Sequence, residues 1–138
     1  MTETSSCIFC KIIKGEISCH KIYEDDKFLA FLDINPTAIG HTLLIPKTHY
    51  RWVYDVPIFG EYWQTAQKIA LAIKNSNLNP EFISFLTMGN EVHHAHIHLI
   101  PRSTNDSIQP VLASIPHLKP SDDEFSTTAQ IIRNSLIK

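Results

Sequence analysis

Residues 89–100 read Gly-Asn-Glu-Val-His-His-Ala-His-Ile-His-Leu-Ile and hold four of the eight histidines in a chain of 138 residues. If histidines were scattered at that frequency, a His-x-His-x-His pattern would arise by chance in roughly 3% of such chains. The stretch 94–100 alternates like a strand, which predicts His94, His96 and His98 on one face and apolar residues on the other. Because the apolar face should be the buried one, the three imidazoles are expected on an open surface.

Three interpretations of this histidine row differ in the chemistry they assign. In the first interpretation, the histidines lie on an ordinary polar strand face and have no chemical role. Binding of one metal by all three histidines is opposed by geometry, because His94 and His98 lie ~13 Å apart along a strand, while zinc holds its ligand atoms within ~4 Å of one another. The remaining interpretation is a surface for an extended anion such as a phosphate. A neutral imidazole can attack phosphorus, and a protonated one pairs with phosphate oxygens.

The composition favours one globular, cytoplasmic domain. The chain has 12 Lys and Arg against 14 Asp and Glu and is 43% hydrophobic, which is typical of a single domain with its own core. A net charge of −2 argues against broad electrostatic capture of nucleic acid or of an anionic membrane. No apolar run approaches the ~20 residues of a membrane span. The N-terminus has no signal-peptide pattern, and three cysteines do not make a secreted disulfide framework.

Glycine spacing excludes two common phosphate-binding motifs. The four glycines stand at positions 15, 40, 60 and 89, at least 20 residues apart. A P-loop and a GxGxxG dinucleotide turn both need clustered glycines, so neither is present.

Periodicity predicts five strands and one long helix. The strand-like runs cover residues 20–24, 28–34, 42–46, 82–87 and 94–100. Between residues 57 and 76, apolar side chains recur every three or four positions, as on one face of an amphipathic helix. They are Phe59, Tyr62, Trp63, Ala66, Ile69, Ala70 and Ile73.

The tail after residue 102 begins as a polar connector with three prolines and ends as a helix. Ser121 and Glu124 form a capping box for a helix over about 122–137. Its apolar face, expected to dock on the body or on a second subunit, comprises Phe125, Ala129, Ile132 and Leu136.

The stretch 94–100 resembles the signature of the histidine triad (HIT) superfamily, in which three histidines alternate with apolar residues. Three earlier blocks resemble the N-terminal part of that family in the same order: Cys7-Ile8-Phe9-Cys10-Lys11-Ile12-Ile13, Phe31-Leu32-Asp33-Ile34 and Gly40-His41-Thr42-Leu43-Leu44-Ile45-Pro46-Lys47-Thr48-His49. The resemblance is nearest to the zinc-binding bacterial and archaeal HIT-like proteins. It covers roughly residues 5–102 as a HIT domain and leaves 103–138 as a C-terminal extension.

The resemblance implies an α+β fold, an antiparallel sheet with one long amphipathic helix. It also implies a homodimer, and the helix of 57–76 is expected near the interface. The implied function is a nucleotide hydrolase or transferase that cleaves at the α-phosphate of a purine nucleotide conjugate. The conjugate would be a nucleoside 5′-phosphoramidate or an acyl-nucleotide.

The resemblance also assigns roles to four histidines. By position, His96 is the nucleophile that forms a covalent nucleotidyl-imidazole, which water then cleaves. His94 and His98 flank it and either stabilise phosphate oxygens or orient its ring. His41 resembles the family's fourth histidine.

A nucleotide-binding set follows from the same blocks. Phe9, Phe31 and Ile34 resemble the base pocket, and Asp33 resembles the carboxylate that holds the ribose hydroxyls. Without the resemblance, the three apolar residues would be expected in an ordinary core and Asp33 in a turn.

The sequence departs from the family just before the triad. Many members have Gly-Gln-Ser or Gly-Gln-Thr where this chain has Gly89-Asn90-Glu91. An ionised Glu91 beside a phosphate would be repelled by ~1–4 kcal/mol. Either the strand begins early, so that Asn90 binds on the face of His94 and Glu91 points away, or Glu91 is protonated and acts as an acid. Two alternatives therefore stay open: a dinucleoside polyphosphate hydrolase, and a nucleotide-binding regulatory protein with weak turnover.

The pair Cys7 and Cys10 has the spacing of metal ligands, and in a reducing compartment such thiols bind metals more often than they form disulfides. A tetrahedral site needs two further ligands. His49 and His94 resemble the zinc-binding histidines of family members that carry the cysteine pair, so a structural zinc is expected. Other nearby candidates are Cys19, His20 and, with a register shift of one, His93.

Overall fold

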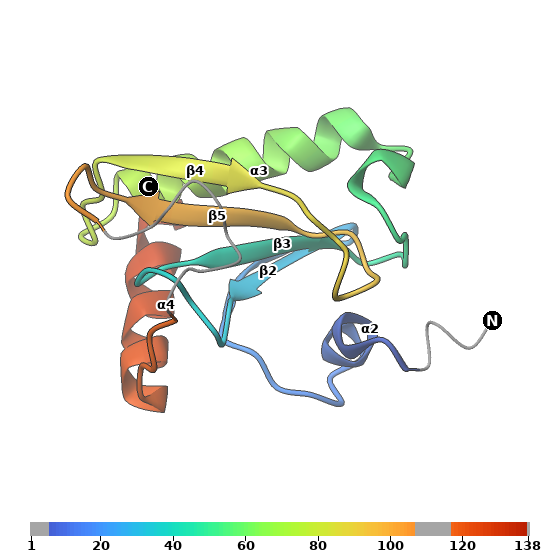
Figure 1. Ribbon diagram of the computed structural model, residues 1–138, viewed down its shortest axis with the longest axis horizontal. Coiled ribbons are helices and arrows are strands. Elements are labelled where there is room, and N and C mark those ends of the chain that lie inside the picture. Colours follow the sequence, from blue (N-terminus) through green and yellow to red (C-terminus); the bar gives the residue numbers. More distant parts are fainter. Residues whose placement is uncertain (1–5, 107–116, 138) are drawn as a thin grey trace.

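A five-stranded antiparallel sheet of order β1-β2-β3-β5-β4 runs through the computed structural model, which describes residues 6–106 and 117–137 (Figure 1). The strands are β1 (Lys21–Glu24), β2 (Phe28–Leu32), β3 (Thr42–Pro46), β4 (Phe82–Leu86) and β5 (Ile97–Arg102). The helical elements are α2 (Ile8–Ile13), the short η1 (Val53–Asp55), α3 (Phe59–Lys74) and α4 (Asp122–Ile137). This confirms the predicted α+β fold, with its antiparallel sheet, long helix and C-terminal helix. The middle of the expected connector, residues 107–116, lies outside the described residues.

The two faces of the sheet pack into separate apolar clusters. On one face, side chains of β2, β3 and β5 such as Phe28, Leu44 and Ile97 pack with α3 and α4. On the other face, Phe31 and Leu43 pack with α2. Every residue of β2 and β3 is buried because both faces of these central strands are covered.

Helix α3 buries the predicted apolar stripe against the sheet. Tyr62 is fully buried; its hydroxyl donates to the carbonyl oxygen of Leu44 at 2.8 Å, and its ring stacks on Phe28. Of the predicted stripe, Phe59 remains exposed at the start of the helix and Trp63 is only partly buried. These two side chains lie beside β4, where the ring of Trp63 stacks on Phe85.

Helix α4 begins with the expected capping box and docks on the body. The backbone N–H of Ser121 donates to Glu124, and the N–H of Glu124 donates to the Ser121 hydroxyl. Ala129 and Ile132 are buried, and Phe125 stacks on His20, which precedes β1. Helix α4 therefore shares the core of the sheet with α3.

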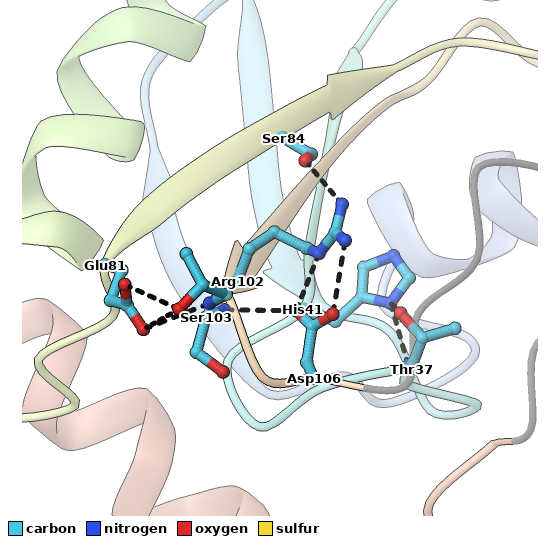
Figure 2. Close-up of polar contacts among 8 residues, drawn as sticks. Thr37, His41, Glu81, Ser84, Arg102, Ser103 and Asp106 are labelled. Atoms are coloured by element: carbon cyan, nitrogen blue, oxygen red, sulfur yellow. Dashed lines mark hydrogen bonds and ion pairs between the residues drawn. The ribbon is translucent and has the colours of Figure 1, made fainter.

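Beyond the end of β5, a polar network fixes the chain where it leaves the sheet (Figure 2). The guanidinium of Arg102 pairs with both carboxylate oxygens of Asp106 and donates to the Ser84 hydroxyl of β4 at 3.0 Å. Glu81 accepts from the backbone N–H of Thr104 at 3.0 Å. These contacts join the ends of β4 and β5. Among residues 6–106 and 117–137, no helix is long and apolar enough to cross a membrane.

Candidate active site and metal centre

The strand that carries the histidines begins later than the alternation predicts. Strand β5 starts at Ile97, and residues 91–94 form bends instead of extending the strand to position 94. The physical reason is a contact distant in sequence, since the N–H of Ala95 donates to the carbonyl oxygen of Tyr50 at 2.7 Å. His98 is therefore the one triad histidine within the strand, opposite Leu43 of β3.

The open surface expected for the three imidazoles is also wrong for two of them, whereas His98 is partly buried. His94 is fully buried, and 7% of His96 is exposed. Helix α2 covers them, because the ring of Phe9 makes edge-on contacts with both, at centroid distances of 5.8 and 5.2 Å. The alternation correctly predicts that the imidazoles lie on the face of the sheet opposite α3. That face is not open, because α2 packs on it.

The bends before β5 exclude one of the two alternatives for Glu91, the early strand. Asn90 and Glu91 are both exposed and precede the strand. The early strand that would place Asn90 on the face of His94 does not form. Glu91 is therefore a solvated side chain on the loop that leads into the triad.

His96 is held in one tautomer by the backbone of His94. Its Nδ1 lies 2.7 Å from the carbonyl oxygen of His94, which can only accept, so Nδ1 carries the proton and Nε2 carries a lone pair. Burial lowers the pKa of His96, although the hydrogen bond to His94 opposes this shift. The side chain is thus a neutral imidazole with Nε2 available as a nucleophile.

His98 is held in the opposite tautomer by a chain of hydrogen bonds. The backbone N–H of Thr37 donates to Nδ1 of His41 at 3.1 Å (Figure 2), so the proton of a neutral His41 is on Nε2. That Nε2 lies 2.9 Å from Nδ1 of His98 and 3.5 Å from a carboxylate oxygen of Asp33. Since Nδ1 of His98 accepts, its proton is on Nε2. Burial lowers the pKa of both rings, that of His98 to about 3, so both are neutral near pH 7.

The four predicted zinc ligands lie close together in a cluster that includes one triad histidine, His94. The ligand atoms of Cys7, Cys10, His49 and His94 all lie within 4.8 Å of one another. The Sγ to Nδ1 distances are 3.4 Å from Cys7 to His94, 3.3 Å from Cys10 to His49 and 3.6 Å from Cys10 to His94. A tetrahedral zinc with ordinary bond lengths places sulfur and nitrogen ligands about 3.6 Å apart. The other candidates, Cys19, His20 and His93, are outside this cluster.

The chemistry of the cluster also fits a cation. Burial and the neighbouring Cys7 raise the pKa of the Cys10 thiol to about 11, so a thiolate there requires a positive charge nearby. Nε2 of His94 lies 2.8 Å from the carbonyl oxygen of Pro46 and donates to it, which leaves Nδ1 free to ligate. Both ring nitrogens of His94 are thereby engaged away from a phosphate. Of its two expected roles, orientation of the His96 ring is the one this geometry supports.

A second group of potential ligands does not fit a metal. Asp33, His41 and His98 also have ligand atoms within 4.8 Å of one another. However, Nδ1 of His41 accepts the N–H of Thr37, so Nε2 of the neutral ring keeps its proton and has no lone pair for a metal. A ligating histidine normally donates from its other nitrogen. This group is therefore a hydrogen-bond chain, in contrast to the cysteine–histidine cluster.

A family model described as HIT domain matches residues 14–105 of the chain. Among curated proteins, the chain is 45% identical to Protein hit of Bacillus subtilis over 103 residues, which are 70% of this chain and 71% of that protein. The protein belongs to the HIT family. Adenosine 5'-monophosphoramidase HNT1 of Saccharomyces cerevisiae is 41% identical over 77% of this chain and 68% of its own length. Adenylylsulfatase HINT3 of Arabidopsis thaliana is 34% identical over 98% of this chain and 72% of its own.

Solved HIT structures have the same fold over nearly the whole chain. A Zn-bound histidine triad family protein from Mycobacterium smegmatis matches with a TM-score of 0.80 at 30% identity, covering 97% of this chain and 95% of that one. A Hit-like protein from Bartonella henselae matches with a TM-score of 0.83 at 31% identity, covering 95% and 96%. The match includes the C-terminal part of this HIT chain, which extends beyond the residues covered by the family model.

The residues expected to bind the nucleotide in this HIT protein lie around α2 and β2. Phe9 and Phe31 are buried, with their rings in edge-on contact at 5.6 Å. Ile34 is 65% exposed just beyond β2. Asp33 is partly buried and accepts the N–H of Asn35 through one oxygen, while its other oxygen faces His41.

Three groups of the site escaped sequence analysis because they are backbone atoms. They are the N–H of Thr37, the carbonyl oxygen of Pro46 and the carbonyl oxygen of Tyr50. A main-chain donor or acceptor leaves no mark in residue type. The sole sequence signal was that Pro46 lies within the matched block 40–49, and Thr37 and Tyr50 lie close to its ends.

Proposed function

We propose that this HIT protein hydrolyses a purine nucleotide conjugate, a nucleoside 5′-phosphoramidate or an acyl-nucleotide, through a covalent nucleotidyl-His96. The observation that carries the proposal is the pairing of opposite tautomers. His96 has a lone pair on Nε2, and the neighbouring ring of His98, 5.1 Å away between centroids, has a proton on Nε2. One ring can attack while the other donates. The names of the yeast and Arabidopsis relatives, an adenosine monophosphoramidase and an adenylylsulfatase, fit cleavage at the phosphorus of an adenosine nucleotide.

In the proposed reaction, phosphorus changes partner twice. Nε2 of His96 attacks the α-phosphorus, and the bond to the leaving group breaks. The leaving nitrogen takes up one proton from solvent, and His98 stabilises it by donating a hydrogen bond from Nε2. Water then attacks the phosphorus, the bond to His96 breaks, and water releases one proton as the nucleoside monophosphate departs. His94 acts through its carbonyl oxygen by keeping Nε2 of His96 directed at phosphorus.

The nucleotide itself is proposed to lie over the end of β2. Asp33 would accept the ribose hydroxyls, a role that suits a partly buried carboxylate with two oxygens. Phe9 and Phe31 would form the floor of the base site, with Ile34 as an exposed apolar wall. Asn90 would contact the phosphate or the leaving group from the loop before the triad.

A structural zinc is proposed at Cys7, Cys10, His49 and His94. When bound, the metal would neutralise the two thiolates and join α2 to the loop before β5. Its contribution to catalysis would be indirect, because His94 is both a ligand and the residue whose carbonyl oxygen orients His96. Zinc on His94 would leave the Nε2 of His96 free.

A homodimer is proposed through β4 and α3. Strand β4 is an edge of the sheet, and Phe82 and Phe85 on it are 41% and 44% exposed. Phe59 on α3 continues this apolar surface. The buried Nε1 of Trp63 has no hydrogen-bond partner within residues 6–106 and 117–137. A second subunit would cover the aromatic surface, as such interfaces commonly do.

The direct test is a turnover screen with the wild-type protein. The substrates are lysyl and amino phosphoramidates of AMP and GMP, together with diadenosine tri- and tetraphosphate. Release of AMP or GMP from a phosphoramidate is the expected result. Preferential cleavage of the diadenosine compounds would favour the dinucleoside polyphosphate hydrolase. Nucleotide binding without cleavage of any compound would favour the regulatory protein and contradict the proposal.

A further inference from the structure

The C-terminal extension makes two hydrogen bonds to the loop that carries the Thr37 donor. The backbone N–H of Leu118 donates to the carbonyl oxygen of Pro36 at 2.8 Å. Nδ1 of His117 lies 2.7 Å from the carbonyl oxygen of Asn35 and donates to it. Both donors lie beyond residue 105, where the HIT family model ends. They contact the two residues immediately before Thr37.

The peptide group between Pro36 and Thr37 is therefore held from both sides. A peptide group is planar, and in its trans form the C=O and the N–H point in opposite directions. Within the part of the chain that the structure describes, every peptide bond is trans. Leu118 holds the oxygen of this group, and Nδ1 of His41 accepts its N–H at 3.1 Å. Fixing the carbonyl toward Leu118 thus aims the N–H at His41 and also polarises it.

The surrounding packing keeps this loop against α4. Pro36 is fully buried, and it lines a small cavity together with Asp33, His41, Pro120 and Phe125. Side chains of the C-terminal extension thus line the same cavity as Pro36 of this loop and His41 of the hydrogen-bond chain.

We propose that the backbone N–H of Leu118 is a positioning group for catalysis, because it fixes the Pro36–Thr37 peptide and so keeps the proton of His98 on Nε2. Without the Thr37 donor, His41 can carry its proton on Nδ1 and accept at Nε2, and His98 then carries its proton on Nδ1. A single hydrogen bond suffices to change such a tautomer ratio about fivefold. The inference rests on the proposed function for the role of His98 and makes the C-terminal extension part of the active site.

The test compares Leu118→Pro, which lacks the backbone N–H, with Leu118→Ala, which keeps it. Nitrogen NMR of full-length protein labelled in histidine reports which ring nitrogen of His98 is protonated, with His98→Gln giving the assignment. We expect the proton on Nε2 in wild type and in Leu118→Ala, and a mixture of tautomers in Leu118→Pro. If Leu118→Pro yields too little folded protein, the ester analogue at position 118 deletes the N–H alone. An unchanged His98 spectrum in Leu118→Pro or in the ester analogue would overturn the proposal.

Kinetics separates positioning from general damage. An AMP phosphoramidate with an alkylamine leaving group needs a hydrogen-bond donor at its leaving nitrogen, whereas the p-nitrophenyl ester of AMP does not. Leu118→Pro should lower kcat for the phosphoramidate about fivefold and leave kcat for the ester within twofold of wild type. An equal loss on both substrates would contradict the positioning role. If wild type cleaves neither substrate, the proposed function fails, whereas the NMR result still decides the inference about Leu118.

Discussion

The carbonyl oxygen of His94 lies 2.7 Å from Nδ1 of His96, while the ring of the same His94 faces two thiols through its Nδ1. One residue thus belongs to two sites. Its side chain joins the cysteine–histidine cluster, and its backbone selects the tautomer of the proposed nucleophile. We therefore expect metal binding to affect turnover through His94, although the proposed nucleophile His96 is not itself a metal ligand.

Removing the thiols should therefore affect both metal content and turnover. The double variant Cys7→Ser/Cys10→Ser is expected to lose zinc, to melt at a lower temperature and to turn over about 10–100-fold more slowly, because the loop that holds His94 loses its anchor. Metal analysis of protein purified without chelator or affinity metal, with calorimetry, makes the measurement. Cys19→Ser is the matched control and should behave as wild type. Unchanged metal content and melting temperature in the double variant would rule out the site.

Replacing His41 should impair the hydrogen bond from His98 to the leaving group while leaving the nucleophile in place. In His41→Phe, Nδ1 of His98 loses the partner that lies 2.9 Å away, so its proton is no longer held on Nε2. We expect kcat for an amine leaving group to fall about 100-fold, as is typical when a hydrogen-bond donor to a developing charge is lost. Steady-state kinetics should show a smaller change in KM. A variant with wild-type kcat would show that the hydrogen-bond chain has no role in turnover.

Stability should decrease on acidification because the buried histidines resist protonation. Burial lowers the pKa of His98 from 6.5 to about 3. Between these values the unfolded chain binds a proton that the folded chain does not. The contribution to the free energy of unfolding is therefore complete above pH 6.5 and is lost as the pH falls toward 3, by up to about 1.4 kcal/mol per pH unit. The free energy of unfolding, measured with urea between about pH 7 and pH 5, should depend less steeply on pH in His98→Gln than in wild type. An equal or steeper pH dependence in the variant would contradict this cause.

A charge on the aromatic edge should separate the proposed dimer. Phe85→Glu places a carboxylate on exposed β4 next to Trp63, and we expect a monomer by sedimentation at micromolar concentration. Leu71→Glu is the control, since Leu71 is an exposed apolar residue of α3 that lies toward α4. A monomeric wild type, or a Phe85→Glu protein of unchanged mass, would refute this interface.

Features that depend on neighbours in sequence were predicted well. The continuous apolar runs marked β2 and β3, the three- and four-residue spacing marked α3, and Ser121 with Glu124 marked the start of α4. The convergence of the cysteine–histidine cluster was also predicted, because the cysteine spacing and the family resemblance together named residues 39 to 87 positions apart.

Features that depend on contacts between residues distant in sequence were not predicted. The alternation of the triad resembles a strand from His94 onward, but the bond from Ala95 to Tyr50 replaces strand pairing there. The triad sequence itself does not indicate that α2 packs over His96. The contact of Leu118 with Pro36 joins two backbone groups 82 positions apart, and residue types do not reveal such a bond.

The central claim is the covalent nucleotidyl-His96, and the variant His96→Ala tests it most directly. Acid-labile nucleotide attached to protein, trapped by rapid quenching with a radiolabelled phosphoramidate, should accumulate in wild type and be missing from the variant. Turnover should be abolished in the variant while nucleotide affinity stays near that of wild type, because in the proposed mechanism His96 supplies the attacking atom. Turnover of His96→Ala within a few-fold of wild type would contradict the account.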